Sequence, residues 1–103
     1  MQAATHRAPT SFFGNRVSAT PNEMRGVAGR LGAKSRLSNV GDPYGNFEWD
    51  YTTEDGEPFS VYDRNNAHTL ADDEVVEWHI AAADNYCATS AEYELREQLE
   101  QSA

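Results

Sequence analysis

The sequence has 103 residues, enough for one domain with a small core. It has a net charge of −9 and one cysteine, so no disulfide can form within the chain. No apolar run approaches the ~20 residues that a membrane-spanning helix needs, and the N-terminus lacks the apolar core of a signal peptide. We therefore expect a protein of a reducing, cytoplasmic compartment with no membrane partner.

The charges are separated along the chain. Residues 1–40 contain six Lys or Arg and one Glu, a sum of +5, whereas residues 41–103 contain two Arg and sixteen Asp or Glu, a sum of −14. Such asymmetry bears on partners and solubility rather than on the fold. We expect no direct binding of nucleic acid by the acidic part, because phosphate contacts require Lys or Arg.

The first segment in chain order, residues 1–12, has no apolar period. We expect it to form a flexible N-terminal arm. The remainder, residues 13–103, is expected to fold as a single α+β domain.

A helix is predicted near residues 21–31. Thr20 and Glu23 have the spacing of a capping box, and Pro21 suits the first helical position. Gly32 is placed to end the helix.

Residues 46–63 predict a β-hairpin whose register depends on its turn. A two-residue Asp-Gly turn would divide the large apolar side chains between the two faces. A three-residue loop over 54–56, with its glycine left-handed, shifts the pairing by one residue and gathers those side chains on one face. Because register follows the hydrophobic pattern, we expect the second arrangement, with Tyr51 opposite Phe59. The opposite face then carries Glu48, Asp50, Thr52, Ser60 and Tyr62.

Residues 73–83 are compatible with two structures. Val76, Trp78 and Ile80 alternate as in a strand, and a strand over 74–80 would complete a three-stranded sheet. A helix would also form an apolar stripe here. We favour the strand.

A C-terminal helix is predicted over residues 90–101. Thr89 and Glu92 have the spacing of a second capping box, and Glu92 can pair with Arg96 one turn later. The predicted fold is therefore α+β, with a small three-stranded antiparallel sheet packed against an N-terminal and a C-terminal helix. One sheet face packs on the helices, and the other is expected to be wet and acidic.

No motif indicates catalysis or a cofactor. Gly-rich residues 26–35 lack the Gly-Lys-Ser/Thr of a phosphate-binding loop. His68, His79 and Cys87 match no compact metal-ligand spacing, and no carboxylate is marked by an apolar niche. We predict no catalytic residue, no metal site and no cofactor, and we predict that the protein is not an enzyme.

The order GDPYGNFEWDYTTEDGEPFSVYD, then VEWHI, then a charged helix resembles small acidic phage and prophage accessory proteins of an uncharacterised family. This resemblance implies an α+β fold, a phage origin and a location in the host cytoplasm. The size and charge are also similar to those of phage inhibitors that mimic DNA.

The acidic face is the remaining signal for function. Same-face carboxylates on a strand lie about 6.8 Å apart, comparable to the phosphate spacing of a nucleic-acid strand. We therefore expect a phage-encoded inhibitor that occupies the basic cleft of a host DNA- or RNA-binding protein, such as DNA gyrase or a restriction or CRISPR complex. The predicted partner-binding residues are Glu48, Asp50, Glu54, Asp55, Glu57, Asp72, Asp73, Glu74 and Glu77.

Two alternatives to inhibition stay open. The protein could be a structural or assembly protein that self-associates, for example as a homodimer, or by docking the basic residues 1–40 on the acidic part of a neighbour. The carboxylates could instead serve solubility alone.

Overall fold

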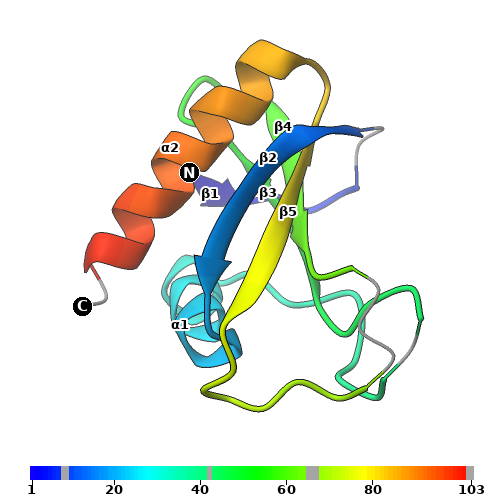
Figure 1. Cartoon of the computed structure of the whole chain (residues 1–103). Coiled ribbons are helices and arrows are strands. Elements are labelled where there is room, and N and C mark those ends of the chain that lie inside the picture. The colour runs from blue at the N-terminus through cyan, green and yellow to red at the C-terminus, as the bar shows by residue number, and fades with distance from the viewer. Residues whose placement is uncertain (8–9, 42, 65–67, 102–103) are drawn as a thin grey trace.

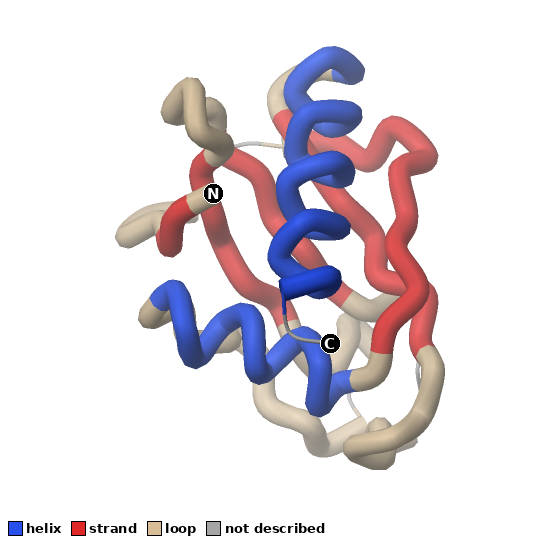
Figure 2. Tube along the Cα trace, turned by 90° about the vertical axis from the view of Figure 1, so that its left-hand side faces the viewer, coloured by secondary structure: helices blue, strands red, loops and turns tan. Residues whose placement is uncertain are grey.

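The computed structural model describes residues 1–7, 10–41, 43–64 and 68–101. Within these residues, the chain forms a five-stranded antiparallel sheet in the order β1-β3-β4-β5-β2 (Figure 1). Figure 2 shows both helices on one face of the sheet. The elements in chain order are β1 (Gln2–Ala3), β2 (Ser11–Ala19), α1 (Pro21–Leu31), β3 (Glu48–Thr52), β4 (Pro58–Tyr62), β5 (Val76–Ala82) and α2 (Asn85–Gln101).

Helix α1 has the predicted bounds and the predicted caps. The Thr20 hydroxyl oxygen accepts from the Glu23 main-chain N–H at 3.1 Å, and the Glu23 carboxylate accepts from the Thr20 N–H at 3.0 Å. Gly32 ends the helix in the left-handed conformation, with φ of 75°. The capping box and the terminal glycine therefore fix both ends locally.

The hairpin of β3 and β4 takes the predicted register. Tyr51 lies opposite Phe59, and Trp49 lies opposite Val61. Gly56 has a φ of 83°, and the loop is closed by a main-chain hydrogen bond of 2.8 Å from Thr53 to Glu57. The three-residue loop thus places the large apolar side chains on the face covered by the helices.

The ambiguous segment is a strand, as predicted, and it continues to Ala82. Val76, Trp78 and Ile80 are buried on the helix side of β5. The Trp78 indole N–H donates to the Ala19 carbonyl at 2.9 Å, which joins β5 to the end of β2. Trp78 packs against Trp49, with 5.5 Å between ring centroids, at the centre of the core.

The predicted three-stranded sheet is wrong in strand number, because β1 and β2 come from the first nineteen residues. Gln2 and Ala3, which we expected in a flexible arm, pair with β3. Strand β2 pairs with β5, but its register shifts between Phe12 and Arg16. This irregularity removes the simple alternation by which a strand is recognised in a sequence.

Helix α2 begins at Asn85, five residues before the predicted start. The Asp84 carboxylate accepts from the Cys87 main-chain N–H at 2.8 Å and so occupies the cap position. Thr89 lies inside the helix, where its hydroxyl donates to the Asn85 carbonyl at 3.0 Å. The predicted capping box at Thr89 is therefore wrong.

Candidate functional site

The sheet face away from the helices carries Glu48 and Asp50, but it is not the acidic face that we predicted. Arg36 lies across both carboxylates, with its Nη2 2.8 Å from Glu48 Oε2 and its Nε 2.5 Å from Asp50 Oδ2. The Ser60 hydroxyl also donates to Asp50 at 2.7 Å. The hydrogen bond to Asp50 is the main reason why the pKa of Arg36 is raised, so the guanidinium stays charged. These two carboxylates are therefore both paired with one guanidinium of the same chain, and a single negative charge remains among the three groups.

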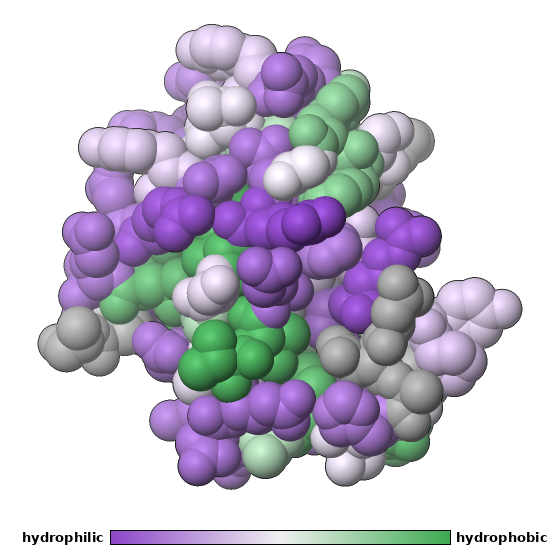
Figure 3. All heavy atoms as spheres, viewed as in Figure 1, coloured by the Kyte–Doolittle hydropathy of each residue, from purple (hydrophilic) through white to green (hydrophobic). Residues whose placement is uncertain are grey.

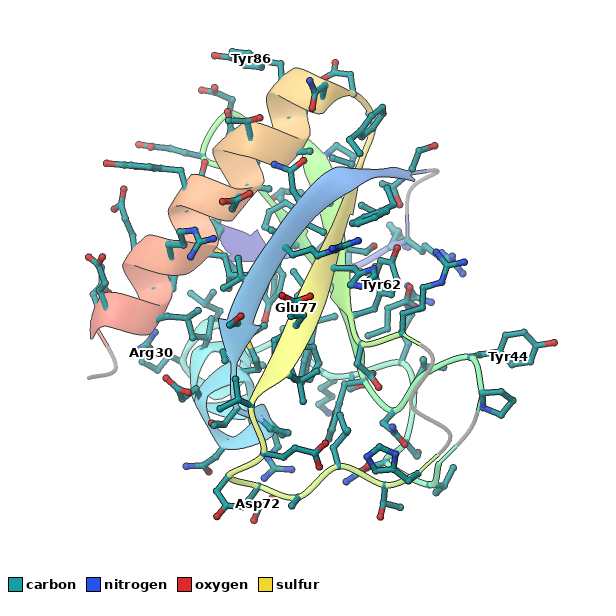
Figure 4. The ribbon with its side chains drawn as sticks, viewed as in Figure 1. Arg30, Tyr44, Tyr62, Asp72, Glu77 and Tyr86 are labelled. Carbon is teal, nitrogen blue, oxygen red and sulfur yellow. The ribbon has the colours of Figure 1, made fainter. Side chains whose placement is uncertain are left out.

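Four more predicted residues lie away from the hairpin tip, Asp72, Asp73 and Glu74 in the loop before β5 and Glu77 near the start of β5. The Asp72 carbonyl accepts from the Asn22 N–H at 3.1 Å, and the Asp72 carboxylate pairs with Arg25. Glu74 accepts from the Ala71 N–H at 3.2 Å. Asp73 and Glu77 are exposed. In Figure 4, Asp72 lies at the bottom of the molecule, whereas Tyr86, at the start of α2, lies at the top.

The remaining predicted residues, Glu54, Asp55 and Glu57, are exposed at the hairpin tip. The tip is held against α2, because the Glu54 main-chain N–H donates to both carboxylate oxygens of Glu94 at 3.0 and 3.2 Å. The nine predicted residues therefore do not form one array. They divide into a pair bonded to Arg36, a set around the start of β5 and a set that continues onto α2.

The third set belongs to a larger surface that combines carboxylates with exposed tyrosines. Tyr86 and Tyr93 are 76% and 67% exposed, and their spacing of seven residues places them on the same side of α2. We call this surface the tip–helix surface. It consists of Glu54, Asp55 and Glu57 of the tip and of Tyr86, Tyr93, Glu97 and Glu100 of α2.

A hollow of about 400 Å³ lies within the tip–helix surface, between the tip and the helix. Its lining includes Glu54, Tyr93, Glu94 and Glu97, and no Lys or Arg side chain among the described residues contributes to it. The amino group of Met1 lies 3.0 Å from Glu94 at its edge. The Tyr93 pKa is raised, chiefly by its hydrogen bond with Glu97 and by the charge of that carboxylate. Carboxylates beside an aromatic ring suit the cationic end of a Lys or Arg side chain.

The sequence alone does not predict the α2 part of this surface. The sequence pattern places Glu97 and Glu100 on the solvent-exposed side of the helix. It suggests that the tyrosines belong to the hydrophobic core. One feature of the sequence could have indicated this surface. Tyr86 and Tyr93 lie outside the apolar stripe that Ala91 and Leu95 form on the helix. Large aromatic residues on the polar side of a helix are typical of protein interfaces.

In the described part of the chain, no group of three or more His, Cys, Asp or Glu residues is placed to hold a metal ion. None of the helices in that part has the length and apolar character needed to cross a bilayer.

Comparison with known proteins adds no relative to this description. No protein-family model matches the sequence, and neither a curated protein nor a solved structure is significantly similar to it. The fold itself defines the class, an α+β domain with a five-stranded antiparallel sheet, two helices on one face and an acidic tip–helix surface in its described part.

Proposed function

We propose that this protein is a non-enzymatic binding protein whose tip–helix surface docks on a basic partner. The observation that carries the proposal is the hollow between tip and helix, which is lined by Glu54, Tyr93 and Glu97, while Glu94 is already bonded to the Glu54 N–H and to the Met1 amino group. A Lys or Arg side chain of the partner would enter this hollow. The cationic group of this side chain would lose its bound water. In return it would form charge-assisted hydrogen bonds with carboxylates and contact the face of an aromatic ring.

The surface is fixed before a partner arrives, which favours binding. Glu94 holds the tip through the main-chain N–H of Glu54, and Asp84 caps the first turn of the helix. Tyr93 and Glu97 contact each other one helical turn apart. Because the anchoring groups are held by secondary structure, little conformational entropy remains to be lost on docking.

We propose as the partner a DNA- or RNA-binding protein with a basic cleft, which the protein would inhibit by occupying that cleft. A cleft that binds phosphates by Lys and Arg is complementary to a surface of carboxylates. The similarity in size and charge to phage inhibitors that mimic DNA suggests the same class of partner. Relative to the sequence prediction, the proposed surface keeps the hairpin tip, drops the carboxylates of the sheet face and of the segment around the start of β5, and adds α2.

The experiment uses immobilised full-length protein and a cell-lysate fraction retained on heparin, which is enriched in nucleic-acid-binding proteins. One variant carries Glu54→Gln and Glu97→Gln. A matched control carries Asp72→Asn and Asp73→Asn, so it loses the same charge at the opposite end of the sheet. We expect the wild type and the control to retain a partner at about 0.15 M salt and the first variant to lose it.

Duplex DNA is then added as a competitor. Displacement of the captured protein supports occupation of its nucleic-acid site. Equal loss of capture in both variants would show that only net charge matters, and capture that DNA does not affect would contradict the proposed inhibition.

A further inference from the structure

A second concave site lies on the opposite side of the sheet from the helices. It is a pocket of about 660 Å³, lined by several segments that are far apart in the sequence. The connection from β1 to β2 contributes Arg7, and the connection from α1 to β3 contributes Arg36 and Tyr44. Tyr62 is the last residue of β4, and Arg64 follows it. In Figure 4, Tyr62 and Tyr44 both lie on the side of the sheet away from α1 and α2.

The pocket concentrates positive charge in a protein whose net charge is −9. Its lining contains three arginines and one carboxylate, Glu48, a sum of +2. Arg36 is held in place by Glu48 and Asp50, with the contacts of 2.8 and 2.5 Å described above. Among the described residues, neither Arg7 nor Arg64 forms an ion pair. Arg64 does hydrogen-bond the Tyr62 phenol, but a guanidinium has further N–H donors, so both arginines can still donate to an anion.

Flat apolar surfaces lie beside these arginines. Phe12 lines the pocket and stacks on His79, with 4.6 Å between ring centroids, and the Tyr62 ring lies 5.5 Å from the same imidazole. Burial is the main cause of the raised pKa of Tyr62, so its phenol stays neutral and adds no negative charge. Figure 3, which views the sheet from its β2 edge, shows hydrophilic side chains in a band between two apolar patches.

We propose that this pocket binds a small phosphorylated ligand with a flat ring, of the nucleoside monophosphate class. Arg7 and Arg64 bind the phosphate through charge-assisted hydrogen bonds, whereas the charge of Arg36 is taken up by Glu48 and Asp50. Tyr62 offers a ring on which the base stacks, whereas the Phe12 ring is already covered by His79 and Arg16. The volume falls within the roughly 300–1,000 Å³ of pockets that enclose ligands of this size.

This site is separate from the tip–helix surface, so the proposal of ligand binding and the proposal of partner docking can be tested independently. The test is a titration of the full-length protein followed by ¹H–¹⁵N NMR with three probes: adenosine monophosphate, inorganic phosphate and adenosine. We expect saturable shifts of the amide signals around Tyr62 and Arg64 with adenosine monophosphate. We expect weaker binding of phosphate, which lacks the ring, and of adenosine, which lacks the charge.

Arginine variants assign the binding to the pocket. Arg64→Gln and Arg7→Gln, both at exposed positions, should each weaken the affinity for adenosine monophosphate about tenfold, the usual size of a charge-assisted contact. Lys34→Gln removes the same charge from an exposed residue outside this pocket and should change nothing. Absence of saturable shifts, equal affinity for adenosine and its monophosphate, or equal effects of Arg64→Gln and Lys34→Gln would overturn the proposal.

Discussion

Asn46 and Asp63 form a buried polar pair that joins the start of β3 to the end of β4. The Asn46 main-chain N–H donates to Asp63 Oδ1 at 2.8 Å, and its side-chain amide donates to Oδ2 at 3.2 Å. The Phe47 N–H donates to the same Oδ1 at 2.7 Å, and both members of the pair are fully buried. Asp63 therefore takes the place of a partner strand for the chain that enters β3.

The first prediction concerns this pair. Asp63→Ala should lower the free energy of unfolding by about 3 kcal/mol or more, because it leaves several buried N–H donors without an acceptor. Urea denaturation followed by tryptophan fluorescence measures the change. Asp55→Ala, at the exposed hairpin tip, should stay within about 0.5 kcal/mol of the wild type. A similar loss in both variants would contradict the structural role of Asp63.

The second prediction concerns Gly45, which approaches the same aspartate. Gly45 has a φ of 128°, and a Cβ atom there would lie 2.7 Å from the Asp63 carbonyl oxygen. Gly45→Ala should cost about 2 kcal/mol or more, since both the conformation and the contact oppose a side chain. Gly26→Ala in α1 is the matched control, and the same urea denaturation measures both. Its Cβ meets open space, so it should stabilise the protein by about 0.5–1 kcal/mol through helix propensity.

The third prediction concerns pH. Burial, followed by the charges of Arg16 and Arg64, lowers the pKa of His79 below 6.5, against the smaller opposing effects of Glu77 and Asp63. The unfolded chain then binds a proton more readily than the folded protein, so stability falls as the pH drops below about 6.5 toward the lower folded value.

Urea titrations at about pH 7.5 and about pH 5.5 measure this loss for the wild type and two variants. His79→Phe, which keeps a ring to stack on Phe12, should lose less stability between the two pH values. His68→Gln, at an exposed position, should behave as the wild type does. If His79→Phe shows the full pH dependence of the wild type, the attribution to His79 is wrong.

The fourth prediction concerns Cys87. The thiol is 5% exposed, and its hydrogen bond with Asp84, with burial as the next cause, raises its pKa to about 11. Because the thiolate is the reactive form, an alkylating reagent at about pH 8 should modify the folded protein slowly and the urea-unfolded protein rapidly. Mass spectrometry at successive times distinguishes the two. Equal rates would show that the first turn of α2 opens readily.

The elements that could be predicted are those whose signals lie within a few residues. Thr20, Glu23 and Gly32 determine both ends of α1, and Gly56 together with the apolar pattern determines the hairpin register. Strand β2 could not be predicted in this way. Its partner β5 lies about sixty residues away, and the register shift before Arg16 interrupts its alternation.

The candidate site was predicted in part, for a related reason. Glu54, Asp55 and Glu57 share the hairpin tip because they are neighbours in sequence. Their association with α2 depends on Glu94, forty residues later. The pairing of Glu48 and Asp50 within the chain depends on Arg36, which precedes β3 by twelve residues. A count of charges along the chain shows neither relationship, because both arise only when the segments pack.

Strand β2 has a consequence for how this protein can meet other molecules. It is the longest strand and lies at the border of the sheet, where unpaired main-chain groups could template the addition of a foreign strand. Gly14, at a φ of 97°, bends this border, and the Arg96 guanidinium caps the Arg16 carbonyl at 3.1 Å. A strand from another molecule would have to displace Arg96 before it could pair with β2. This contact therefore opposes aggregation by extension of the sheet at this border. At this border, contacts with other molecules therefore depend on side chains and not on main-chain hydrogen bonds.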